Sequence, residues 1–114
     1  MAKYEHLPIY KKAFDLTLYF EKVVTNFSRY HKYTLGTDLR NLSREILKMI
    51  ISANNRTVKN EMLLTIREKL EELKVVLRLC KEVKTFNNFD SFSYAICCVV
   101  EISKQNEGWL KSQG

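Results

Sequence analysis

The sequence predicts an all-α fold, an antiparallel up-down-up-down four-helix bundle, in a single domain over residues 1–114. Over four long segments, apolar residues recur at steps of three and four, the spacing of a helix packed along one face. Short polar breaks at residues 28–33, 54–57 and 85–89 make consecutive helices antiparallel. One Pro and three Gly in 114 residues are too few for a turn-rich all-β fold.

The first helix is predicted to begin at Pro8, since proline is well tolerated in the first turn. Its core-facing seam consists of Ile9, Ala13, Leu16, Phe20, Val23 and Phe27. The second helix has the seam Leu35, Leu39, Leu42, Ile46, Met49 and Ala53. Gly36 lies within this helix, where it costs about 1 kcal/mol relative to Ala, and this indicates that another part of the backbone approaches it closely.

Thr57 is the expected N-cap of the third helix, and either Asn88 or Asp90 that of the fourth. The seam of the third helix is Leu63, Ile66, Leu70, Leu73, Leu77 and Cys80. That of the fourth is Phe92, Ile96, Val99 and Ile102, with apolar residues on most other sides. Trp109 is expected to plug the end of the bundle rather than to form an exposed anchor, because a lone Trp near a terminus usually packs.

Two helices carry apolar residues beyond the seam that a monomer needs. In the first helix these residues lie roughly opposite the seam, and in the second they lie well away from it. They are Tyr10, Phe14, Leu18, Leu47 and Ile51. Scattered apolar residues on a surface are normal, but aligned patches are an aggregation liability on a monomer. We therefore expect these five residues to form an oligomer interface.

Basic residues are also sorted along the chain, whose formal net charge is +6. One stripe recurs every fourth residue of the second helix, and another lies beside the seam of the third. Together they comprise Arg40, Arg44, Lys48, Arg67, Lys74, Arg78 and Lys81. Such strips can engage phosphates. The spacing alone favours a solvated face, or pairing with acids of a neighbouring helix or subunit.

No catalytic or metal-binding pattern is visible, so we expect no enzymatic activity, cofactor or metal ion. The isolated glycines exclude a Gly-rich phosphate loop, and no Glu-x-x-His pair is present. The odd set Cys80, Cys97 and Cys98 indicates buried, reduced thiols. Because neither a secretory signal nor an apolar run of about 20 residues occurs, we expect a cytoplasmic protein.

Five short motifs follow one another along nearly the whole chain. They are LPIYKKAFDL at residues 7–16, YTLG-x-x-L at 33–39, Ala-Asn at 53–54, LRLCKE at 77–82 and GWLKS at 108–112. In this order they resemble the accessory variability determinant proteins of diversity-generating retroelements. A related family of four-helix proteins, encoded by intervening sequences in bacterial 23S ribosomal RNA genes, usually lacks the last motif.

The resemblance implies a small basic bundle that assembles into a pentameric barrel and is not itself catalytic. It also implies binding to nucleic acid and to the retroelement's reverse transcriptase, which copies template RNA into cDNA with errors at adenines. Some of the seven basic residues are then expected to contact RNA, DNA or the polymerase, without strong sequence preference. The alternative is a structural protein-interaction module, of the 23S rRNA intervening-sequence type, with no nucleic-acid function.

Overall fold

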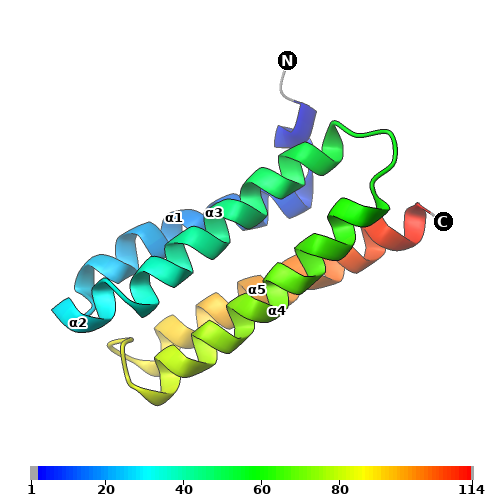
Figure 1. Cartoon of the computed structure of the whole chain (residues 1–114). Coiled ribbons are helices and arrows are strands. Elements are labelled where there is room, and N and C mark those ends of the chain that lie inside the picture. The colour runs from blue at the N-terminus through cyan, green and yellow to red at the C-terminus, as the bar shows by residue number, and fades with distance from the viewer. Residues whose placement is uncertain (1–2, 114) are drawn as a thin grey trace.

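The computed structural model describes residues 3–113 (Figure 1). Its long helices are α1 (Pro8–Val23), α3 (Leu35–Asn54), α4 (Asn60–Glu82) and α5 (Phe89–Ser112). Each packs against the next, and α1 also packs against α5, so the four close a ring in cross-section. The predicted all-α four-helix bundle is confirmed.

Three short helical segments complete the structure: η1 (Lys3–His6), η2 (Val24–Asn26) and α2 (Arg29–Lys32). The start of α1, the α3–α4 connection and the end of α5 lie at one end of the bundle (Figure 1). The segment α2 and the α4–α5 turn lie at the opposite end, which we call the α2 end.

The predicted core seam is confirmed in full in α4, where all six residues are buried. In α1 it holds as far as Phe20. Beyond that point Val24, not Val23, is the fully buried residue. The reason is that the buried line advances by about 3.6 residues per turn, the period of a straight α-helix, and so drifts from the strict three-and-four seam before it reaches Phe27, which is buried as predicted.

In α3 and α5 the buried line differs in part from the predicted seam. Leu35, Leu42 and Met49 of the α3 seam are only partly buried. In α5, Phe92 and Ile96 are half-buried, whereas Ala95 and the polar Asn106 are fully buried. The α5 differences arise because this helix is apolar on most sides, so periodicity alone does not single out the side that faces the core.

The two predicted N-caps have different outcomes. Asn88 caps α5, because its side-chain oxygen accepts a hydrogen bond from the backbone N–H of Ser91 at 2.9 Å. Thr57 is wrong as the cap of α4, which begins only at Asn60. Lys59 precedes this helix and directs its Nζ to the end of α3, where it donates to the carbonyl oxygens of Ala53 (3.0 Å) and Asn54 (3.4 Å). A lysine thus satisfies carbonyls at the end of α3.

Gly36 is in close contact, as predicted, with its neighbours from η2 and α2. Trp109 is half-buried and packs against the core at the end opposite the α2 end, beside Leu7 and Ile9. Cys80 and Cys98 are buried free thiols, but Cys97 is exposed, so the prediction of burial is wrong for Cys97.

Candidate subunit and nucleic-acid interfaces

Four of the five residues predicted at a subunit interface line the boundary between α1 and α3, and Leu18 lies at their edge, where it also borders a hollow lined by Asp15, Lys22 and Tyr94. We call this surface the α1/α3 apolar face. The register of the two antiparallel helices is shown by Glu21 of α1, whose carboxylate lies 3.3 Å from Arg40 Nε of α3, and by Thr17 Oγ1, which lies 3.3 Å from the carbonyl oxygen of Ser43. Continuing this register places Phe14 beside Leu47 and, one turn further, Tyr10 beside Ile51. Two patches that are separate in the sequence therefore become one.

Exposure varies across the α1/α3 apolar face. Phe14 and Leu18 are the most open, with 45% and 44% of their surface exposed. Tyr10, Leu47 and Ile51 are half-buried, and the first two also pack against the core. The rings of Tyr10 and Phe14 lie 6.0 Å apart. Phe14 and Leu18 are accordingly the part of this face with most surface left to bury against another molecule.

The basic stripe of α3 is partly neutralised by Glu21 of α1. Arg40 Nη2 donates to the backbone oxygen of Glu21 at 2.9 Å, and its Nε lies 3.3 Å from the Glu21 carboxylate. Arg44 Nε donates to the same carboxylate at 2.6 Å. Lys48 has no carboxylate within 4.0 Å among residues 3–113. Pairing with a neighbouring helix, an alternative that the spacing left open, therefore holds for two of the three residues.

The strip on α4 is also divided. Arg67 forms a bidentate ion pair with Glu107 of α5, with both N–O distances at 2.8 Å. Hydrogen bonding to Arg67 lowers the pKa of the Glu107 carboxyl, and the same bond raises the pKa of Arg67. Lys74 pairs with Glu71 at 3.0 Å. Within the described part of the chain, Arg78 and Lys81 have no carboxylate partner within 4.0 Å.

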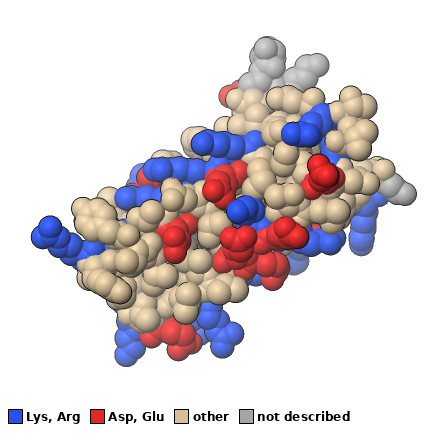
Figure 2. All heavy atoms as spheres, in the orientation of Figure 1, with Lys and Arg blue, Asp and Glu red and all other residues tan. Residues whose placement is uncertain are grey.

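This strip follows the boundary between α4 and α5. At one end Arg67 meets Glu107, and at the other Lys81 Nζ lies 5.4 Å from the centre of the Phe92 ring. On the face shown in Figure 2, carboxylates gather near the middle and most Lys and Arg side chains lie toward the margins. The basic residues therefore do not merge into one continuous surface on this face.

Sequence reasoning missed a second exposed apolar line, which we call the α4 outer stripe. It consists of Leu64, Val75 and Leu79, which are 44%, 61% and 48% exposed. Their spacing of eleven and then four residues keeps them on one side of the helix, so the helical period already contained the signal. Beside Val75 and Leu79 the surface is hollowed into a groove of about 370 Å³.

No described helix has both the length and the apolar character needed to cross a membrane. Among residues 3–113, no group of three or more His, Cys, Asp or Glu side chains is arranged to hold a metal ion.

Comparison with known proteins identifies one family. A family model described as bAvd-like matches residues 7–113, which is almost the entire chain. The curated proteins contain no match to this sequence.

Proposed function

Because the chain belongs to the bAvd-like family, the accessory variability determinant proteins that its motifs resemble, we propose that it is a non-catalytic accessory protein of a diversity-generating retroelement. In this role it forms a homo-oligomer that binds nucleic acid and the retroelement's reverse transcriptase, and so supports mutagenic cDNA synthesis. The observation that carries the proposal is the match over residues 7–113, joined to an exposed apolar face that a monomer does not need.

The positions of the two apolar surfaces favour a ring over a two-fold dimer. A two-fold dimer uses the same face on both copies, whereas a closed ring needs two different complementary faces. The helices α1 and α4 are diagonal in the bundle, since each packs against α3 and α5. The α1/α3 apolar face and the α4 outer stripe therefore point to different sides of the protomer, as head-to-tail contacts require. That such a ring would contain five subunits is implied by the family resemblance.

Nucleic-acid binding is best supported by the cations that lack an internal partner. Lys48, Arg78 and Lys81 have no carboxylate within 4.0 Å among the described residues, and Arg78 and Lys81 are exposed. Repeating these side chains around an oligomer multiplies the phosphates that one assembly can neutralise. Such binding is steeply salt-dependent and largely indifferent to base sequence.

The test uses the purified full chain and the reverse transcriptase of the same retroelement. We expect the chain to retain a labelled 20-nucleotide RNA at about 50 mM salt, to release most of it by about 200 mM, and to capture the polymerase in a pull-down. Capture of the polymerase without RNA retention would favour the structural interaction module instead. Failure of both assays would overturn the proposal.

A further inference from the structure

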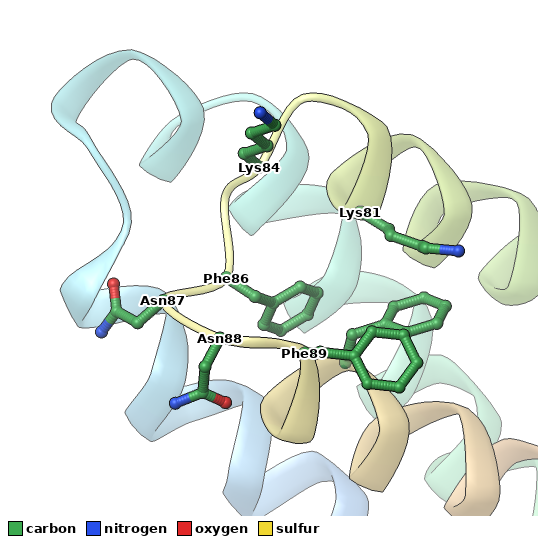
Figure 3. Close-up of a pocket in the computed structure, with 7 residues that line it drawn as sticks. Lys81, Lys84, Phe86, Asn87, Asn88 and Phe89 are labelled. Carbon is green, nitrogen blue, oxygen red and sulfur yellow. The ribbon is translucent and has the colours of Figure 1, made fainter.

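The turn between α4 and α5 and the adjoining ends of both helices line an open pocket of about 510 Å³ at the α2 end of the bundle. It is lined by Lys81, Lys84, Phe86, Asn87, Asn88, Phe89 and Phe92. No acidic side chain is among them. In Figure 3, Phe86 and Phe89 project to the same side of the turn, below Lys81, while Asn87 and Asn88 point away. The pocket is therefore aromatic on one side and cationic on the other.

The aromatic side of the pocket consists of Phe86, Phe89 and Phe92, and contacts within the bundle fix its position. Phe86 is buried and packs edge-on against Phe27 of the neighbouring segment, with ring centres 5.5 Å apart. Phe92 continues this cluster at 6.3 Å from Phe86, and Phe89 lies 5.9 Å from Phe92. Thr85 fastens the turn by a backbone hydrogen bond to the carbonyl oxygen of Cys80 at 3.0 Å. A guest would meet a surface that is already ordered.

Phe89 differs from the other two rings because most of its side chain does not pack against the bundle. It is the first residue of α5, yet 65% of its surface is exposed. Lys81 Nζ lies 5.9 Å from the centre of the Phe89 ring and 5.4 Å from that of Phe92. An exposed aromatic ring beside an ammonium group is the combination that proteins use to hold single-stranded nucleic acid, with the ring stacking on a base and the cation facing the backbone.

We propose that this pocket holds one unstacked base of a single-stranded nucleic acid, with the base against Phe89 and an adjacent phosphate at Lys81. The inference rests on the proposed function in that the chain binds nucleic acid at all. The basic strip of α4 ends at Lys81, so a strand that follows Arg78 and Lys81 arrives at the pocket. An acidic peptide fits less well, because it would satisfy the lysines and leave the open ring of Phe89 without a flat partner.

The test compares Phe89→Ala with Phe89→Trp, which keeps a stacking surface, and with Val58→Ala. Val58 is a matched control, because it is 78% exposed and lies in the α3–α4 connection at the other end. Binding is measured by fluorescence anisotropy with a 20-nucleotide single strand and with the duplex of the same sequence. We expect Phe89→Ala to weaken single-strand binding by roughly 5- to 150-fold and to leave duplex binding unchanged. Phe89→Trp and Val58→Ala should retain the wild-type affinity.

Three results would overturn the inference while leaving nucleic-acid binding itself in place. They are an unchanged single-strand affinity in Phe89→Ala, an equal loss for single strand and duplex, and binding of the duplex alone by the wild type. Tight binding of a polyglutamate peptide that Phe89→Ala abolishes would assign the pocket to an acidic protein partner instead. If the wild type bound neither nucleic acid, the nucleic-acid part of the proposed function would fail as well, so the two failures can be told apart.

Discussion

A Cβ atom added to Gly36 would lie 2.5 Å from Cγ1 of Val24 and 3.2 Å from the carbonyl oxygen of His31. The first turn of α3 therefore rests directly on η2 and on the end of α2. Such contact leaves no room for a methyl group, because Val24 is fully buried and His31 contributes backbone.

The first prediction is that Gly36→Ala destabilises the protein, although Ala is the better helix former by about 1 kcal/mol. Overpacking of this kind costs about 1–3 kcal/mol, which outweighs the gain in propensity. Urea unfolding measures the change. Gly108 is the matched control, since no atom lies within 4 Å of an added Cβ, and Gly108→Ala should raise stability by about 0.5–1 kcal/mol. Equal stabilisation by both substitutions would contradict the prediction.

The close approach at Gly36 could be predicted from the sequence because a glycine inside a helix has a known cost. The break at residues 54–57 was also predicted, and α3 does end at Asn54. The capping of this end could not be predicted, since it depends on Lys59, whose ammonium reaches back to Ala53. A cap made by a residue outside the helix leaves no periodic signal. Because α5 carries apolar residues on most sides, its sequence likewise did not indicate which residues face the core. Asn106 is one of the buried residues that was missed.

The second prediction concerns Asn106, which is fully buried and donates its Nδ2 to the carbonyl oxygen of Leu63 at 3.0 Å. Asn106→Asp replaces this donor with a buried carboxylate that faces a carbonyl oxygen. We expect a loss of about 3 kcal/mol or more in the free energy of unfolding at pH 7. Asn87→Asp, at an exposed position, should change stability by no more than about 0.5 kcal/mol. Similar losses in the two variants would show that Asn106 is not buried as described.

The third prediction concerns the thiols. Burial raises the pKa of Cys80 from 9.0 to about 11 and also raises that of Cys98, whereas Cys97 is exposed. At pH 8 a maleimide should modify Cys97 rapidly and the other two only as the protein unfolds, which mass spectrometry of the digested protein resolves. Cys80 binds its proton more tightly in the folded state. Its contribution to stability is therefore present below about pH 9 and declines as the pH rises toward 11. Rapid modification of Cys80 in the native state would contradict the prediction.

The sequence could predict which residues of a candidate interface share one face of a single helix, but not what the neighbouring helices place beside them. Spacing placed Arg44 and Arg67 on the surface, but their partners Glu21 and Glu107 come from other helices, 23 and 40 residues away in the chain. Which cations remain available is a property of the packed bundle. The pocket at Phe89 escaped prediction for a similar reason, since the turn that forms it includes Lys84 in a left-handed conformation with a φ of 59°.

The fourth prediction tests the proposed assembly. Light scattering should give the wild type a mass several times the 13.5 kDa of one protomer. Phe14→Glu combined with Leu18→Glu should yield a folded monomer, because both side chains are already about half exposed in the protomer and charges there oppose burial against a second copy. Val100→Glu on α5, where the side chain is 39% exposed, serves as the control and should leave the mass unchanged. A monomeric wild type would contradict the assembly.

The fifth prediction separates cations that are free to bind phosphates from those that are not. Lys48→Gln and Arg78→Gln should each reduce the slope of log affinity against log salt by about 0.7–0.9 for every phosphate that the variant no longer neutralises. The double variant Arg67→Gln, Glu107→Gln removes an ion pair that is already neutral and leaves the net charge unchanged, so its slope should equal that of the wild type. Anisotropy titrations of a labelled RNA at several salt concentrations give these slopes. A reduced slope in the double variant alone would mean that phosphates displace Glu107 from Arg67, and would move the site to the opposite end of the α4 strip.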